Sequence, residues 1–324
     1  AAFSYAQSER MVLVEEGTNA SCGPCASQNP AFKTLLDANT DNVVSIKYQW
    51  YFPGYDPMHE HNPEEANGRF DGYYGQNGVP TSMLDGDVPN GNTPGFDPGN
   101  LGWYDGAPGG YSQELLDNAA SVPASFDMNV SFDLTPTQIT VNAGATCTQD
   151  VSGDLKFRIC VIEKEILFDS PPGSNGEAEF YNVMKKFLPG INGTAMAGSY
   201  TVGDEFSVTE SWNLENIYDI EEVAVVVFIQ DDNNKEVLQA GFAPTGNFQA
   251  SFAYDAAVLD VVGFPDFSCE NTVTPMVEIR NDGSETLTSL DLDYVLNDVS
   301  GSVEWTGSLE FYESATVELG DLTF

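Results

Sequence analysis

Basic side chains are scarce in this sequence. It has 11 lysines and arginines against 50 aspartates and glutamates, which gives a formal net charge of −39. Such a chain repels nucleic acid and anionic membrane surfaces, so neither is expected as a partner. Histidine is scarcer still, and the two histidines, His59 and His61, lie in an acidic, turn-rich stretch. Alternate residues of an extended segment face the same side, so these two are weak candidates for a divalent metal site; a solvated loop is the alternative.

Long apolar runs are also absent. No stretch of about 18 apolar residues occurs, so the sequence predicts no transmembrane segment. Residues 1–7, AAFSYAQ, look like the end of a secretory signal, with small residues after a lost apolar core. We therefore expect an exported protein whose mature chain starts near Gln7 or Ser8. Five cysteines in 324 residues are too few for a disulfide-dense scaffold, although export would let disulfides persist.

A chain of 324 residues is too long for one ordinary hydrophobic core, so more than one domain is expected. The pattern of apolar residues predicts three domains after the signal remnant at 1–7. Residues 8–121 mix strands and helices. Residues 122–252 alternate apolar and polar positions as a β-sandwich does, with a helical insertion near 177–188. Residues 253–324 are short strands between Gly and Asn turns, typical of an Ig-like sandwich. The predicted fold class is multidomain: an α/β N-terminal domain followed by two all-β sandwich (Ig-like) domains.

Local patterns place the main elements of the first two domains. In the first, strands are expected at 11–16 and 43–50 around a helix at 26–36, followed by a strand at 79–86 and a helix at 111–120. In the second, two apolar runs flank the turn sequence DDNNK, which predicts a hairpin over residues 223–242.

Cys22 and Cys25 stand two residues apart, between a predicted strand and a predicted helix. A zinc site would need two further ligands at suitable spacing, which the sequence does not offer. A purely structural bridge would close a very small loop and constrain the unfolded chain little. A redox pair fits better, because the helix N-terminus would stabilise a Cys22 thiolate and Cys25, one turn on, would resolve a mixed disulfide. Gly23 and Pro24 set the turn that keeps the two sulfurs close.

The other three cysteines lie in the predicted β regions. Cys147 and Cys160 fall in neighbouring strands, which makes Cys147–Cys160 the first choice for a second disulfide and leaves Cys269 free. A simple hairpin turn at residues 151–154 would offset these two cysteines by several residues, which counts against a direct bridge. Buried, inert thiols are the alternative.

Four features of the sequence resemble the thioredoxin superfamily. The tetrapeptide CGPC is that of the thioredoxin active site, and Pro30 matches the proline that kinks the active-site helix. Glu16 falls where thioredoxins carry a buried acid that serves proton transfer. Val79-Pro80-Thr81 resembles the cis-proline segment that lies against the disulfide and receives the substrate backbone.

The resemblance implies a thioredoxin-like fold for residues 8–121 and a role for each matching residue. Cys22 would be the nucleophile, Cys25 the resolving thiol, Glu16 a proton acceptor and Pro80 the platform for the substrate backbone. The expected substrate contacts are Ser21, Gly23, Pro24, Val79 and Thr81. Ser21 departs from the family, since thioredoxin has a tryptophan there. Glu15 and Glu16 are adjacent, and in a strand only one of them is expected to point inward.

Longer segments resemble the outer-membrane-protein-28-related proteins of Bacteroidetes. These segments are VLVEEGTNASCGPC at 12–25, NVMKKFLPGINGT at 182–194 and VAVVVFIQDDNNKEVLQAGF at 223–242. That family joins a thioredoxin-like domain to a β-sandwich and is exported, which implies a location at the outer membrane, the cell surface or outside the cell. Residues 253–324 resemble, more loosely, Ig-like modules of bacterial surface proteins. In such chains a C-terminal sorting domain for type IX secretion often follows.

Together these features predict an exported thiol–disulfide oxidoreductase-like protein. Its partners would be protein thiols or disulfides and, at the envelope, secretion or surface-assembly machinery; no dissociable cofactor is implied. The alternative is a non-catalytic surface interaction, adhesion or secretion-cargo protein whose thioredoxin-like domain holds a stable disulfide. Most of the chain is β-sandwich material of the kind used for binding, and Ser21 removes a substrate-contacting aromatic residue, which favours the alternative.

Overall fold

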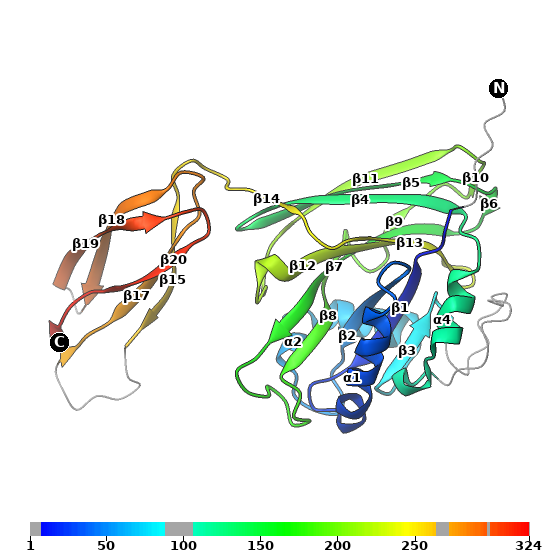
Figure 1. Ribbon diagram of the computed structural model, residues 1–324, viewed down its shortest axis with the longest axis horizontal. Coiled ribbons are helices and arrows are strands. Elements are labelled where there is room, and N and C mark those ends of the chain that lie inside the picture. The colour runs from blue at the N-terminus through cyan, green and yellow to red at the C-terminus, as the bar shows by residue number, and fades with distance from the viewer. Residues whose placement is uncertain (1–7, 88–105, 264–271, 297–298, 324) are drawn as a thin grey trace. The chain divides into compact units, whose positions relative to one another are not determined.

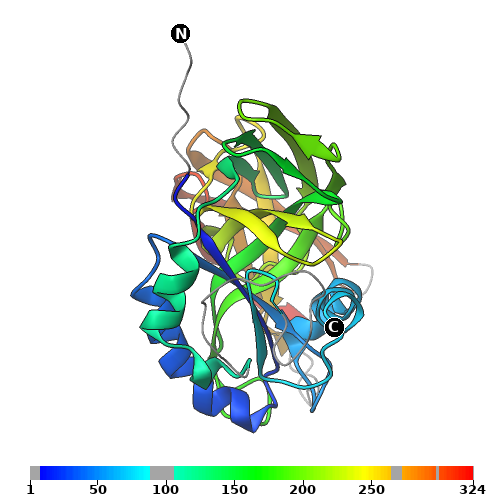
Figure 2. The same cartoon turned by 90° about the vertical axis from the view of Figure 1, so that its right-hand side faces the viewer.

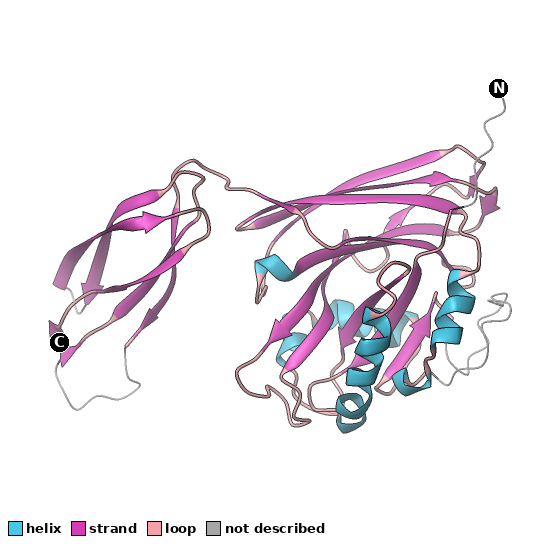
Figure 3. Ribbon diagram, viewed as in Figure 1, coloured by secondary structure: helices cyan, strands magenta, loops and turns pink. Residues whose placement is uncertain are grey.

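The computed structural model describes residues 8–87, 106–263, 272–296 and 299–323. The chain divides into two compact units. Unit 1 comprises residues 1–133 and 138–247, and unit 2 comprises residues 134–137 and 248–324. The predicted boundary at 252/253 lies near the end of unit 1, whereas the predicted boundary at 121/122 falls inside it. Helices are found in unit 1, and the described part of unit 2 consists of strands and loops (Figure 3).

The first half of unit 1 contains most of its helices. Its elements are β1 (Val12–Thr18), α1 (Gly23–Asp37), β2 (Val43–Gln49), α2 (Pro57–His61), α3 (Pro63–Asn67), a π-helix (Gly68–Tyr73), β3 (Thr81–Leu84), a 3-10 turn (Pro108–Gly110) and α4 (Gln113–Ala120). Strand β1 pairs in parallel with β2 and antiparallel with β3. Helices α1 and α4 lie together on one face of these strands (Figure 2). Apolar residues of β1 and of the two helices form the core between them: Val12, Val14, Phe32, Leu36, Leu115 and Leu116.

The second half of unit 1 is almost entirely β. Its strands are β4 (Phe126–Thr135), β5 (Gln138–Cys147), β6 (Val151–Ser152), β7 (Leu155–Leu167), β8 (Glu179–Leu188), β9 (Thr194–Ala195), β10 (Ser199–Tyr200), β11 (Glu205–Asn213), β12 (Val223–Asp231), β13 (Val237–Ala243) and β14 (Asn247–Phe248), with a 3-10 turn at Ile220–Glu222. The predicted hairpin is β12–β13, whose strands pair antiparallel. A smaller sheet of order β11-β5-β4-β14 covers β7, β12 and β13 (Figure 1). Phe157 of β7 stacks on Phe206 of β11 across this interface, with 5.1 Å between ring centroids.

One large sheet joins the two halves of unit 1, with the strand order β13-β12-β7-β8-β2-β1-β3. The junction is a parallel pairing of β2 with β8, in register at Lys47 and Val183. The sheet is curved so that β13 lies close to residues 10 and 11, which lead into β1. There Arg10 donates to the Val237 carbonyl at 2.8 Å, and the Met11 amide donates to Gln239 Oε1 at 2.9 Å. Residues 8–121 and 122–252 therefore share a sheet and its core instead of forming two separate domains.

The predicted helix at 177–188 is wrong, because residues 179–188 form strand β8 and the two residues before them belong to a loop. The pairing of β7 with β8 shifts register between Val161 and Ile162, and Asn182 has a left-handed backbone with φ of 52°. The shift breaks the two-residue alternation of the strand. Phe180, Met184 and Phe187 are buried at spacings of four and three residues, which is the spacing of a helix face.

Unit 2 is a small all-β unit with its own core. Its strands are β15 (Ala256–Val262), β16 (Thr272–Val273), β17 (Met276–Asn281), β18 (Leu287–Leu296), β19 (Val299–Leu309), β20 (Ser314–Glu318) and β21 (Leu322–Thr323). They pair as β15-β17-β20, β18-β19 and β16-β21. The buried core residues include Val277, Ile279, Leu292, Leu309 and Val317. Across the described residues of both units, no helix is long and apolar enough to cross a bilayer.

Candidate redox site

Cys22 and Cys25 form a disulfide at the start of α1, with 5.2 Å between their Cα atoms. Cys22 is the N-cap of the helix: its backbone is extended, and its sulfur accepts a hydrogen bond from the Cys25 amide at 3.1 Å. Pro24 occupies the first turn, where a missing N–H costs no helical hydrogen bond. The Cys22 sulfur thus lies at the positive end of the helix, where a thiolate is stabilised.

Pro80 lies on the segment that passes beside the disulfide. The Val79–Pro80 peptide bond is cis, and the Val79 carbonyl oxygen is 3.7 Å from Cys22 Sγ. Thr81 begins β3 and its hydroxyl donates to the Gly78 carbonyl at 2.9 Å. The structure therefore brings Val79, Pro80 and the cysteine pair together, as the sequence resemblance predicts.

Glu15 and Glu16 are both fully buried, so the expectation that only one points inward is wrong. Both faces of β1 are covered, one by α1 and α4 and the other by the core beneath the π-helix. Glu16 pairs with Lys47 of the neighbouring strand β2, 2.9 Å from Lys47 Nζ to Glu16 Oε2. Within the described part of the chain neither Glu16 oxygen has a hydrogen bond of good geometry, so the contact is an ion pair in a buried setting.

The loop between β7 and β8, residues 168–178, lies against residues 19–22, which form the cysteine-bearing loop between β1 and α1. The Ser174 amide donates to Ser21 Oγ at 3.1 Å, and the Asn175 amide donates to the Ala20 carbonyl at 3.2 Å. The Asn175 side chain donates to the Cys22 carbonyl, also at 3.2 Å. Cys22 is only 1% exposed as a result of these and neighbouring contacts. An external thiol must displace part of this covering before it can reach the bridge.

We expect Gly173→Ala to make the bridge easier to reach. A Cβ at Gly173 would lie 2.1 Å from the Ala20 carbonyl oxygen, so the β7–β8 loop has to move away from the cysteine-bearing loop. The rate at which dithiothreitol opens the disulfide, followed by alkylation and mass spectrometry, should rise. Gly190→Ala is the matched control, since its Cβ would meet nothing within 4 Å. Equal rates in the two variants would contradict a covering role for the loop.

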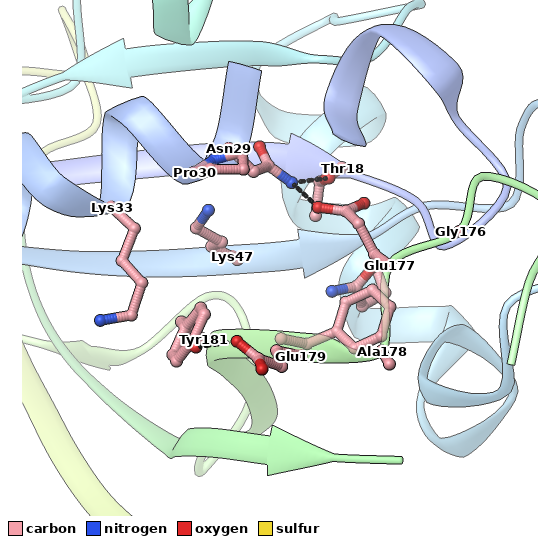
Figure 4. A pocket seen from close by; sticks show the side chains of 12 residues that line it. Thr18, Asn29, Pro30, Lys33, Lys47, Gly176, Glu177, Ala178, Glu179 and Tyr181 are labelled. Atoms are coloured by element: carbon pink, nitrogen blue, oxygen red, sulfur yellow. Dashed lines mark hydrogen bonds between the residues drawn. The ribbon is translucent and has the colours of Figure 1, made fainter. Parts of the chain in front are cut away.

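A pocket of about 440 Å³ lies beside α1, next to the same loop (Figure 4). Its lining includes Lys33 of α1, Lys47 and Gln49 of β2, and residues 176–181. Asn29 of α1 and Glu177 meet across it: Asn29 Nδ2 donates to Glu177 Oε1 at 3.0 Å and contacts Thr18 Oγ1 at 3.3 Å. Lys33 lies over the Tyr181 ring, 4.2 Å from its centroid.

His59 and His61 lie on the short helix α2 instead of an extended segment, so they do not share a face as predicted. His59 Nε2 is 3.2 Å from Asn67 Oδ1, and His61 Nδ1 is 3.3 Å from Lys185 Nζ. Burial, with a smaller effect of the Lys185 charge, lowers the pKa of His61 to about 4. No group of three or more metal-ligating side chains gathers among the residues that the structure describes.

Cys147 and Cys160 are free, buried thiols, so the predicted Cys147–Cys160 disulfide is wrong. Cys147 ends β5, and its thiol donates to the Gln149 carbonyl at 3.0 Å. Cys160 belongs to the core of the large sheet, next to Ile162 and Phe187. Burial raises the pKa of both thiols, which keeps them protonated and inert. Cys269 lies outside the described residues.

Three polar residues of this region were not singled out from the sequence: Lys47, Asn175 and Glu177. Lys47 is a single charge in the apolar run VVSIKYQW, which is a signal for a buried partner on the neighbouring strand. Asn175 and Glu177 come from a loop far along the chain, and their neighbours in sequence carry no sign that they reach the cysteines.

No family model and no curated protein matches this sequence. Among solved structures, HBP35 of Porphyromonas gingivalis is similar, with a TM-score of 0.58 and 13% identity over 92% of this chain and 98% of that chain. A protein of Agrobacterium tumefaciens gives a TM-score of 0.45 and 15% identity over 75% of this chain and 97% of that chain. A domain of the outer membrane lipoprotein Omp28 from P. gingivalis gives 0.29 and 14% identity over 39% of this chain and 92% of that chain. The HBP35 match shows a shared fold over nearly the whole of both chains.

Proposed function

We propose that the chain is an exported thiol–disulfide exchange protein with a thioredoxin-like active site. The observation that carries the proposal is the Cys22–Cys25 bridge at the N-terminus of α1, with the cis Val79–Pro80 bond against it. A pair of sulfurs that can exchange, a helix N-terminus that stabilises a thiolate and a neighbouring backbone segment are parts that disulfide exchange uses. The substrates would be protein thiols or disulfides.

Exchange would proceed through a mixed disulfide. In the reduced protein the Cys22 thiolate attacks a substrate disulfide, and one substrate sulfur leaves with the electron pair. Cys25 then loses its proton, attacks Cys22 and releases the second substrate sulfur. Glu16 is the buried group on β1 that would accept the proton of Cys25, with Lys47 balancing its charge. Ser21, Gly23, Pro24 and Thr81 would contact the substrate chain beside the bridge.

A second candidate is a binding protein whose disulfide is structural. One observation favours it: Cys22 is 1% exposed, whereas an attacking sulfur must meet its substrate. In that case the β-rich remainder of the chain would carry the function as a surface interaction, adhesion or secretion-cargo protein.

The reduction potential of the Cys22–Cys25 pair distinguishes the two candidates. We expect a value above about −300 mV, as in proteins that exchange disulfides, measured by equilibration with glutathione and mass spectrometry of alkylated protein. A pair that stays oxidised in strongly reducing glutathione buffer would contradict the exchange proposal and support the structural one.

We further propose that the protein belongs with the outer-membrane-protein-28-related proteins and works at the outer membrane or cell surface. The supporting observations are the matching segments 12–25, 182–194 and 223–242, which form β1 with the cysteine loop, strand β8 with the following turn, and the β12–β13 hairpin. Secretion or surface-assembly machinery, including type IX secretion, would be its partner there. Extraction of membranes and detection of the protein at the surface of intact cells would test this location.

A further inference from the structure

The pocket beside α1 offers the buried Glu16–Lys47 pair a route to solvent. The side chains of this pair are 0% and 5% exposed, so bulk water has little contact with either of them. Lys47 lines the pocket, together with Gln49. The Gln49 side chain is buried, and neither of its amide atoms has a partner within the described residues. A pocket of about 440 Å³ whose lining includes this unsatisfied amide group and the Lys47 side chain is suited to hold water.

Glu177 stands on the other side of this pocket, on the β7–β8 loop. It accepts hydrogen bonds from Asn29 of α1 and from Asn175, and the Asn175 side chain also reaches the Cys22 carbonyl. Hydrogen bonds therefore connect Glu177 directly to helix α1 and, through the Asn175 side chain, to Cys22. It is only partly buried, so its carboxyl group has access to solvent that Glu16 lacks.

We propose that Glu177 exchanges protons between solvent and the buried Glu16–Lys47 pair, through water in the pocket. The inference rests on the proposed exchange function. Glu177 touches neither sulfur, so it is a positioning residue that acts through Glu16 and Lys47.

The proton balance of bridge opening shows where this residue would act. An external thiolate attacks Cys22, a new S–S bond forms, the Cys22–Cys25 bond breaks, and Cys25 leaves with the electron pair. Cys25 then takes a proton from the Glu16–Lys47 pair. Glu177 passes a proton to that pair and regains one from solvent, so the net uptake is one proton per bridge opened.

The electrostatic surroundings of Glu177 suit this task. Burial raises the pKa of its carboxyl group and the Glu16 charge raises it further, while the hydrogen bonds from Asn29 and Asn175 and the Lys47 charge oppose the rise. A carboxyl group with a raised pKa stays protonated closer to neutral pH and can still donate there. The other charged and titratable groups lining the pocket are Lys33, Glu179 and Tyr181.

The test is the pH dependence of bridge opening by dithiothreitol in the full chain, corrected for the thiolate fraction of the reagent. In the wild-type protein the corrected rate should fall as pH rises through the pKa of Glu177, because the donor loses its proton. Glu177→Gln keeps an acceptor for Asn29 but cannot exchange protons. We expect this fall to vanish, with a rate about tenfold lower at the acid end.

Two further variants separate proton exchange from a structural role. Glu177→Asp retains a carboxyl group and should keep the pH dependence, whereas Glu205→Gln, exposed at the start of β11, should match the wild type. A Glu177→Gln profile that is unchanged, or lowered equally at every pH, would overturn the inference while leaving exchange intact. A wild-type bridge that dithiothreitol does not open at any pH would overturn both the inference and the exchange function.

Discussion

Replacing Cys22 with serine is expected to reduce thiol–disulfide exchange to the uncatalysed background. Cys22 Sγ lies at the positive, N-terminal end of α1 and accepts a hydrogen bond from the Cys25 amide. This environment stabilises a thiolate. A serine hydroxyl cannot form the mixed disulfide. The measurement is transfer of oxidising equivalents between a disulfide-bonded peptide and glutathione, followed by mass spectrometry.

The matched control removes a cysteine that has no part in exchange. Cys147→Ser keeps a donor for the Gln149 carbonyl, and burial already keeps the Cys147 thiol protonated by raising its pKa. Its exchange rate should equal that of the wild-type protein. Cys25→Ser should accumulate a mixed disulfide on Cys22, since the resolving thiol is gone. Exchange that persists in Cys22→Ser would show that another thiol carries it.

Replacing Arg69 with methionine is expected to have the largest effect on stability. Arg69 and Glu15 are completely buried and joined by two contacts, Nε to Oε1 at 2.8 Å and the second guanidinium nitrogen to Oε2 at 3.0 Å. Gln230 also accepts from Arg69 at 2.8 Å. Removing the cation leaves the Glu15 carboxylate in the core without its counter-charge. The free energy of unfolding should fall by about 3–5 kcal/mol.

Urea unfolding followed by tryptophan fluorescence measures this loss. The control is Lys156→Met, because Lys156 pairs with Asp154 at 2.6 Å on the surface, where the Asp154 side chain is more than half exposed. A surface pair contributes roughly 0–1 kcal/mol, so the two variants should differ clearly. An Arg69→Met protein as stable as the Lys156→Met protein would mean that the buried network adds nothing to stability.

Much of the local structure of unit 1 could be predicted from the sequence, because it is encoded by neighbouring residues. The strand at 11–16, the helix at 26–36 and the strand at 43–50 appear as β1, α1 and β2, with ends that differ by a few residues. The hairpin over 223–242 follows from its turn residues. The pairing of β2 with β8 could not be predicted, since it joins segments that are far apart in the chain. The predicted boundary at 121/122 rests on a change in local pattern, and local pattern does not reveal that the two sides share a sheet.

The cysteine pair and the cis-proline segment could be predicted for the same reason: each is a short local motif. The buried Glu15 could not, because its burial depends on Arg69, Tyr48 and Gln230, which come from three other elements. The covering of Cys22 by Asn175 likewise depends on how β7 and β8 are placed. A local sequence pattern predicts the structure of neighbouring residues. It does not predict which distant segment packs against them.

The shared sheet of unit 1 has a consequence for the order in which the protein matures. Because synthesis starts at the N-terminus, the two cysteines are made long before the β7–β8 loop that covers them. Until that loop and the β12–β13 hairpin follow, β2 has an unpaired edge and Arg69 lacks Gln230. During this interval the thiols are open to oxidation by any nearby disulfide. The Cys22–Cys25 bridge is therefore free to form before the β7–β8 loop packs against it, and it is enclosed only after that loop is in place.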